Sequence, residues 1–75
     1  MKIKIFVFPI FLNGHTYLIQ TYKVFSLDNL RIFFQYKKNL ILIEYNEQII
    51  HSAIWSNTRI KSFDSIEILS IVGGG

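Results

Sequence analysis

The sequence predicts an α+β fold in which one main helix packs on one face of a mixed sheet of four to five strands. Two observations lead to this class. The chain has 75 residues, of which 51% are hydrophobic, and it contains no cysteine, so an apolar core must stabilise it without disulfides or a zinc site. The hydrophobic pattern also gives the order strand, strand, helix, strand, short strand, strand.

A β-hairpin is predicted at the N-terminus. Residues 2–5 alternate between lysine and isoleucine, which is a strand signal. Asn13 and Gly14 predict the turn, because both tolerate a positive φ, and His15–Tyr22 is the expected return strand, neither face of which is cleanly polar. Pro9 cannot donate a ladder hydrogen bond, so we expect the first strand to be broken or bulged there.

A helix is predicted after this hairpin. Ser26 is a suitable N-cap, and Asp28 places a negative charge in the first turn. The helix should end within residues 36–39, where Lys37 and Lys38 suit the carbonyl end. The apolar residues with helical spacing are Leu27, Leu30, Phe33 and Phe34.

The second half of the chain predicts three strands. Residues 40–45 and 48–50 are apolar and flank a turn at Asn46, and residues 66–72 follow Asp64 as the last strand. A loop with a helical turn near Trp55, most often a core residue in so small a domain, lies between them. The right-handed crossover rule places the strand after the helix beside the first strand, in parallel. This arrangement is the β-grasp, or ubiquitin-like, fold, and we expect residues 1–75 to form a single domain.

Composition disfavours several classes of function. The net charge is +3, but the basic residues are scattered along the sequence, which argues against a nucleic-acid site. Every apolar run is interrupted before 18 residues, so no membrane-spanning helix is expected. With two histidines, no cysteine and five scattered carboxylates, neither a metal site nor a catalytic triad is expected. The abundance of Ile, Phe, Lys and Asn suggests an AT-rich gene.

The three final glycines, Gly73, Gly74 and Gly75, cannot contribute side chains to a core, and ordering them costs the most backbone entropy. We expect a flexible tail that reaches on the order of 10 Å when extended. Its only reactive group is the α-carboxylate of Gly75, which a slim arm without side chains can place in the active site of another enzyme. A frayed end without a function is the alternative.

The residues before the tail resemble those of the ThiS family of thiamine-biosynthesis sulfur carriers over roughly residues 40–75. The ordered motifs are Ile43-Glu-Tyr-Asn46, Ile49-Ile50, Trp55, Ile60-Lys61, Asp64, Ile66-Glu-Ile68 and Val72-Gly-Gly-Gly75. The related molybdopterin (MoaD-type) carriers usually end in Gly-Gly, so the third glycine favours the thiamine branch. Phe63 replaces the usual turn glycine, which requires another backbone conformation or packing of Phe63 on the sheet. Residues 1–8 look like an extension that lengthens the first strand, pairs with another chain or follows a partner.

The resemblance implies a carrier and not an enzyme. A ThiF-type adenylyltransferase would use ATP and Mg²⁺ to adenylate Gly75, and sulfur mobilised by a cysteine desulfurase would convert it to a thiocarboxylate. The carrier would then donate this sulfur to a ThiG-type thiazole synthase. The expected partner-binding residues are Ile71, Val72, Gly73 and Gly74. No cofactor is expected on the chain itself.

Three alternatives stay open at this point: a MoaD-type carrier, a ubiquitin-like modifier joined to lysine through Gly75, and a non-covalent β-grasp binding domain with an inert tail. The excess of aromatic residues predicts an exposed patch for a partner and leaves a homo-oligomer open. This excess consists of Phe6, Phe8, Phe11, Tyr17 and Tyr22. No transit peptide is evident, so the expected location is a bacterial cytoplasm or, for an organelle-encoded protein, the plastid stroma.

Overall fold

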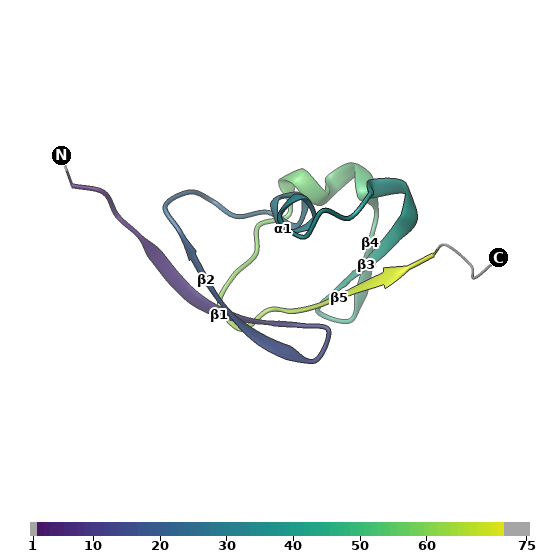
Figure 1. Cartoon of the computed structure of the whole chain (residues 1–75), viewed down its shortest axis with the longest axis horizontal. Coiled ribbons are helices and arrows are strands. Elements are labelled where there is room, and N and C mark those ends of the chain that lie inside the picture. The colour runs from purple at the N-terminus through teal and green to yellow at the C-terminus, as the bar shows by residue number, and fades with distance from the viewer. Residues whose placement is uncertain (1, 72–75) are drawn as a thin grey trace.

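The computed structural model describes residues 2–71, which form a five-stranded mixed sheet with the order β2-β1-β5-β3-β4. The α-helix α1 and the 3₁₀ helix η2 lie together on one side of this sheet (Figure 1). The elements are β1 (Phe6–Leu12), β2 (His15–Thr21), α1 (Leu27–Phe33), η1 (Lys38–Leu40), β3 (Ile41–Tyr45), β4 (Gln48–Ile50), η2 (Ser52–Asn57) and β5 (Ser65–Ser70). The predicted class and element order are therefore confirmed.

The position of the last strand corrects one prediction. The strand after the helix, β3, does not lie beside β1, because β5 lies between them. β5 pairs in parallel with β1 through Phe11 and Leu12, and antiparallel with β3 along Ile41–Tyr45. The long connection from β2 to β3 lets β3 join the sheet one position farther out. The last strand fills the remaining place, where both of its edges find hydrogen-bond partners.

Both predicted hairpin turns are present, and each has two consecutive residues with positive φ. The values are 49° and 80° for Asn13 and Gly14, and 48° and 72° for Asn46 and Glu47. Positive φ at both central residues is the mark of the type I′ turn, whose twist matches that of the flanking strands.

The first strand differs from the prediction in two ways. It begins at Phe6, because β2 ends at Thr21 opposite Phe6 and leaves residues 2–5 without a partner strand. Residues 6–8 of the expected extension therefore lengthen this strand. The strand is also unbroken at Pro9, which pairs with Leu18 in a regular register. The carbonyl of Pro9 accepts a hydrogen bond from the Phe63 N–H, at 2.7 Å, on the side away from β2. The N–H that Pro9 lacks would point the same way, so the ladder with β2 loses nothing.

The helix begins as predicted. The Ser26 hydroxyl accepts a hydrogen bond from the Asn29 N–H, at 3.1 Å, and the Asn29 side chain accepts one in return from the Ser26 N–H, at 3.0 Å. This reciprocal pair is a capping box, in which Asn replaces the more usual Glu or Gln.

The helix ends earlier than predicted, at Phe33 rather than within residues 36–39. Gln35 adopts a φ of 61°, its N–H bonds to Ile32 O, and the Tyr36 N–H bonds to Arg31 O. These two bonds make a Schellman motif with Phe34 as the C-cap, so the last helical residue is Phe33. The early stop leaves Phe33 72% exposed, so the prediction that Phe33 belongs to the buried face is wrong. Phe34 packs against the core.

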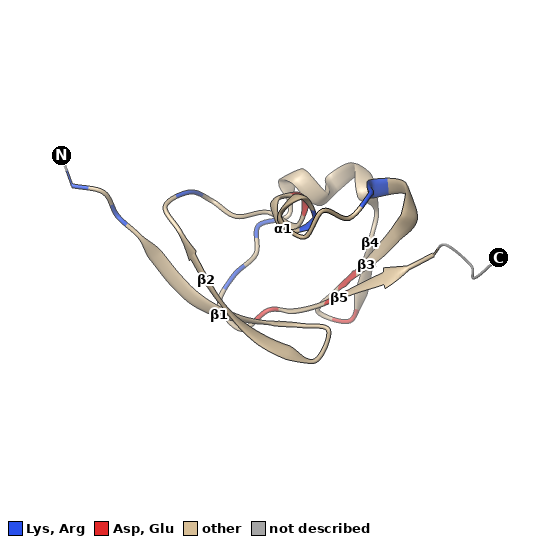
Figure 2. Ribbon diagram, in the orientation of Figure 1, with Lys and Arg blue, Asp and Glu red and all other residues tan. Residues whose placement is uncertain are grey.

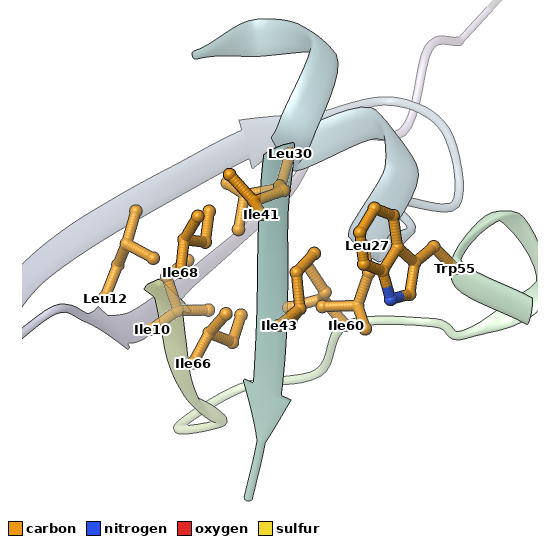
Figure 3. Close-up of a cluster of buried hydrophobic side chains, with 10 residues drawn as sticks. All are labelled: Ile10, Leu12, Leu27, Leu30, Ile41, Ile43, Trp55, Ile60, Ile66 and Ile68. Atoms are coloured by element: carbon orange, nitrogen blue, oxygen red, sulfur yellow. The ribbon is translucent and has the colours of Figure 1, made fainter. Parts of the chain in front are cut away.

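The core lies between the sheet and the helices, and Trp55 is its largest buried side chain. Figure 3 shows its ten members, with Trp55 next to Leu27. The Trp55 Nε1 donates a hydrogen bond to Ile50 O, at 2.8 Å, so the indole is buried without an unsatisfied polar group. The ten residues are Ile10, Leu12, Leu27, Leu30, Ile41, Ile43, Trp55, Ile60, Ile66 and Ile68.

The turn before β5 contains Phe63 where the family has glycine. Phe63 has a φ of 67°, which lies in the left-handed region that favours glycine. The expectation of another backbone conformation at this turn is therefore wrong. Its ring lies 6.4 Å from that of Phe11 in the interior strand β1, centroid to centroid. The contact between the two rings therefore accompanies a strained backbone.

Gln35 gives the first testable prediction. A non-glycine residue in the left-handed region is disfavoured by about 1 kcal/mol, so Gln35→Gly should raise the free energy of unfolding by roughly that amount. Chemical denaturation of both proteins measures the difference. Gln35→Ala is the matched control, because it removes the same side chain without relieving the backbone. Equal stability of the Gly and Ala variants would contradict this account of the helix end.

Candidate functional site

The tail emerges from the centre of the sheet. β5 is bonded on both sides, and the ladder continues one residue beyond it, because the Ile71 N–H donates to Leu40 O at 2.9 Å. Strand β5 thus begins at Ser65 and ends at Ser70, slightly earlier than predicted. Of the predicted site residues, Ile71 is described and is 49% exposed. Val72, Gly73, Gly74 and Gly75 lie outside the described residues.

The start of β5 is held by the carboxylate of Asp64, which is buried. The Tyr45 hydroxyl and the Lys61 N–H donate to Asp64 Oδ2, the latter at 2.7 Å. The Asn46 side-chain amide donates to Asp64 Oδ1 at 3.1 Å, and Asn46 Oδ1 accepts from the Ser65 N–H at 2.8 Å. This Asp64 network ties the turn before β5 to the β3–β4 turn and compensates the buried carboxylate.

Burial raises the pKa of the Tyr45 hydroxyl well above its ordinary value of 10.0, and the hydrogen bond and negative charge of Asp64 raise it further. Tyr45 thus stays a hydrogen-bond donor throughout the neutral range. Its proton is needed, because an ionised phenol beside a carboxylate would repel it.

The N-terminal hairpin is attached to β5 by the side chain of Asn13. Its Oδ1 accepts a hydrogen bond from the Ile68 N–H at 2.8 Å, and its own N–H donates to Ile66 O at 3.0 Å. The turn residue that shapes the hairpin therefore also fixes the middle of the strand that leads to the tail.

The face of the sheet away from the helices presents apolar side chains at the root of the tail. Leu42 and Leu69 are direct cross-strand neighbours, and each is 40% exposed. Ile71 follows Leu69 on the same face, by the alternation of a strand. Leu42, Ile49 and Ile71 also line a hollow of about 290 Å³ at this end of the sheet. We call Leu42, Ile49, Leu69 and Ile71 the tail-root patch.

Two carboxylates lie farther along the same face. Glu44 and Glu67 are direct cross-strand partners in the β3–β5 ladder. Like charges in this position are destabilising, and within residues 2–71 no cation forms a salt bridge with either of them. Together with the tail-root patch they make a surface that is apolar beside the tail and acidic beyond it.

The basic residues are distributed over several elements and connections of the chain (Figure 2). In the described part of the chain, no group of three or more His, Cys, Asp or Glu residues could hold a metal ion. His15 begins β2 beside the turn, and the Nδ1 of His51 accepts a hydrogen bond from the Ala53 N–H. No helix within residues 2–71 is long and apolar enough to cross a membrane.

The expectation of exposed aromatic residues is confirmed in part. Phe6, Phe11, Tyr17 and Tyr22 are exposed, and Phe8 packs against the core. The sequence predicted Ile71 as a partner-binding residue but neither the other members of the tail-root patch nor the Asp64 network. The tail-root patch could not be predicted from the apolar runs of β3 and β5, because only the strand register shows which of their residues face away from the helix. The motif that carries the family resemblance included Asn46 and Asp64, but their separation in sequence did not predict a hydrogen bond between them.

Comparisons with known proteins give a family match, a sequence relative and a similar fold. The sequence profile of the ThiS family matches residues 17–75. An uncharacterized protein, ycf40, of Trieres chinensis is 37% identical over 65 residues, which cover 87% of this chain and 86% of that protein. The fold is similar to the crystal structure of the thiamine biosynthesis protein (ThiS) of Geobacter metallireducens. The TM-score is 0.76 with 19% identity, and the alignment covers 89% of this chain and 99% of the other.

The Asp64 network gives the second prediction. Tyr45→Phe removes the hydroxyl that Asp64 accepts from and should lower the free energy of unfolding by about 1–3 kcal/mol. Denaturation at neutral pH measures the loss. Tyr17→Phe is the matched control, because no hydrogen bond of the Tyr17 hydroxyl is present within residues 2–71. A Tyr45→Phe protein as stable as the control would show that the network does not stabilise the fold.

The pH dependence of stability follows from the same group. A pKa raised in the folded state means that the stabilisation is fully present below the unfolded value of about 10 and is lost as pH rises above it. The wild-type protein should therefore lose stability above pH 10 more steeply than Tyr45→Phe. If the free energies of unfolding of the two proteins fell equally with pH above 10, the role of the Tyr45 proton would be contradicted.

Proposed function

The chain belongs to the ThiS family, and we propose that it is a sulfur carrier for the synthesis of the thiazole ring of thiamine. The observation that carries the proposal is the family match, which covers residues 17–75 and thus includes the three glycines. The fold supports it, because the central strand β5 leads directly toward these residues. The apolar and acidic surface at the root of the tail supplies a place where partner enzymes can bind.

The proposed chemistry takes place on the carboxylate of Gly75. A carboxylate is a poor acyl donor, because oxide is a poor leaving group. Attack of this carboxylate on the α-phosphorus of ATP would release pyrophosphate and form an acyl-adenylate. Persulfide sulfur from the desulfurase, reduced by two electrons from a thiol to the level of sulfide, would then displace AMP, so that a C–S bond replaces the C–O bond to the nucleotide. Transfer of the sulfur to the thiazole precursor would leave the carboxylate for another cycle.

We assign the catalysis to partner enzymes. A ThiF-type adenylyltransferase would bind ATP and Mg²⁺, a cysteine desulfurase would supply the sulfur, and a ThiG-type thiazole synthase would receive it. The sequence has no glycine-rich phosphate-binding loop with a following lysine, so this chain would bind neither nucleotide nor metal by that means. In this proposal the chain is a carrier and a substrate.

The proposed roles of the last residues follow from their size. Gly73 and Gly74 would form an arm narrow enough for the channel of the adenylyltransferase. Ile71 and Val72 would contact the partner where the arm leaves the sheet. The Glu44–Glu67 pair would meet basic side chains of the partner, which would relieve the repulsion between these two carboxylates.

We further propose that the protein works in the plastid stroma or in a bacterial cytoplasm. The residue types with AT-rich codons, which include seven Phe and four Tyr, support this placement. The nucleotide sequence of the gene tests it, and a GC-rich gene would remove the support.

The third prediction concerns the mass of the protein. Incubation with a ThiF-type enzyme, ATP, Mg²⁺, a desulfurase and cysteine should increase the intact mass by the difference between sulfur and oxygen. Deletion of Gly75 should abolish the increase. An unchanged wild-type mass, with partners active on their own carrier, would contradict the proposal. An adduct to a lysine of another protein would instead indicate a ubiquitin-like modifier.

The fourth prediction tests the slim arm. Gly74→Val should block adenylation, because a branched side chain does not fit a channel shaped for glycine. Pyrophosphate release measures the reaction, and thermal unfolding should be unchanged, because this residue follows the last strand. Normal adenylation kinetics of the variant would contradict the channel.

The fifth prediction tests the tail-root patch. Leu42→Lys should raise the KM for the carrier about tenfold or more, since burial of such a side chain contributes roughly 1.5–3 kcal/mol. Val24→Lys is the matched control, because Val24 is also exposed but lies in the β2–α1 connection. Equal KM values for the two variants would place the docking surface elsewhere.

A further inference from the structure

Strand β2 is a free edge of the sheet, and its sequence has none of the features that usually prevent edges from pairing. It is seven residues long and contains no Lys, Asp, Glu or Pro. Its one-to-one register with β1 leaves no bulge. The opposite edge, β4, has only three residues and follows Glu47 directly. A long, uncharged, regular edge is a template for another strand.

The backbone groups that point out of this edge can be identified from the neighbouring strand. In β1, the Pro9 carbonyl and the Phe11 N–H bond to the segment before β5, so the odd-numbered residues of β1 face that way. The even-numbered residues of β1 therefore bond to their partners in β2, which are odd-numbered. The N–H and C=O groups of Thr16, Leu18 and Gln20 are left pointing outward. Within the described residues, none of them has a hydrogen-bond partner.

These outward groups are self-complementary. If two β2 strands meet antiparallel with Leu18 opposite Leu18, both Leu18 residues form a hydrogen-bonded pair. In the same register, Thr16 of each copy faces Gln20 of the other, again as a hydrogen-bonded pair. All outward groups of the three residues would be used, six hydrogen bonds in total by this count.

The side chains in this register are also compatible. Tyr17 of each copy faces Ile19 of the other on the helix side, and such aromatic and β-branched pairs are favourable. On the other side the 68% exposed Leu18 meets its own copy. No charged side chain belongs to β2, so two chains with a net charge of +3 each can approach along this edge.

An apolar groove extends this surface toward the helix. It has a volume of about 360 Å³ and lies between β2 and α1, where Phe33 and Phe34 form part of its wall. The rings of Tyr17 and Phe34 pack edge to face with centroids 5.8 Å apart. A second copy paired along β2 would place its own helix-side residues beside this groove and would shield the exposed Phe33.

We propose that two copies of this chain form a homodimer by antiparallel pairing of their β2 strands, centred on Leu18. The pairing joins two sheets into one continuous sheet and places both helices on the same face. It leaves the root of the tail free, because β5 and the tail-root patch lie toward the other end of the sheet (Figure 1).

Sedimentation equilibrium of the full chain, from about 1 µM to 1 mM, tests the dimer over the range of weak specific association. We expect a concentration-dependent dimer for the wild type. Leu18→Lys, which places like charges opposite each other, should weaken association at least tenfold. Ile49→Lys, at a similarly exposed position of the opposite edge strand, should dimerise like the wild type.

A charge-swap mixture tests the register. Leu18→Lys and Leu18→Glu should each be monomeric alone and should associate when mixed, because opposite charges then meet at the two-fold axis. Backbone hydrogen exchange gives a readout that needs no variant. The Leu18 amide should exchange more slowly as the concentration of wild-type protein rises, whereas the Tyr17 amide, already bonded to β1, should change little.

A wild-type protein that remains monomeric up to 1 mM would overturn the proposal and leave this edge to a strand of another protein. A dimer disrupted by Ile49→Lys, or a charge-swap mixture that fails to associate, would overturn it as well. None of these outcomes depends on the sulfur-carrier proposal, which concerns the other end of the sheet.

Discussion

The fold depends on the hydrogen bonding of β5 along both of its edges. The N-terminal hairpin and the β3–β4 hairpin do not pair with each other, and β5 is the only strand that joins them within the described residues. Its start is held by the Asp64 carboxylate and its middle by the side chain of Asn13. Each of these contacts connects β5 to a type I′ turn, so the two hairpins and the central strand fix one another. The residue that leads to the tail, Ile71, is still within hydrogen-bond reach of Leu40.

A sheet with helices on one face divides the apolar residues into two groups with different consequences. Ile66 and Ile68 of β5 point toward the helices and are buried, whereas Leu69 and Ile71 point away and remain partly exposed. In a protein short enough to need every apolar residue for its core, exposed apolar residues beside the terminus that we propose as the site of chemistry suggest a use outside the fold. The opposed Glu44 and Glu67 indicate the same, because their repulsion costs stability and no cation within residues 2–71 forms a salt bridge with either of them.

Besides the two asparagines of the hairpin turns, three non-glycine residues hold left-handed backbone at points where the chain must turn sharply. Gln35 ends the helix, Glu47 completes a hairpin turn, and Phe63 precedes β5. Single-residue preferences disfavour all three, and hydrogen bonds fix them: the local Schellman bonds at Gln35, the hairpin pairing around Glu47, and the long-range bond from Phe63 N–H to Pro9 O. This is why the helix ends earlier than its periodicity suggested, and why Phe63 can hold a conformation that usually favours glycine.

The sequence by itself determined the order of the elements, the two turns, the helix cap and most of the core, because each depends on residues close together in the chain. Asn13-Gly14, Ser26 and the spacing of Leu27 and Leu30 are examples, and the ThiS motif rests on residues of the same kind. Only the tertiary structure decided the place of β5 between β1 and β3, the harmless position of Pro9, and the meeting of Tyr45, Asn46 and Asp64. It also decided which apolar residues of β3 and β5 face away from the helices. The physical reason is that strand neighbours and register depend on contacts between residues far apart in sequence, and the periodicity of a single segment does not encode them.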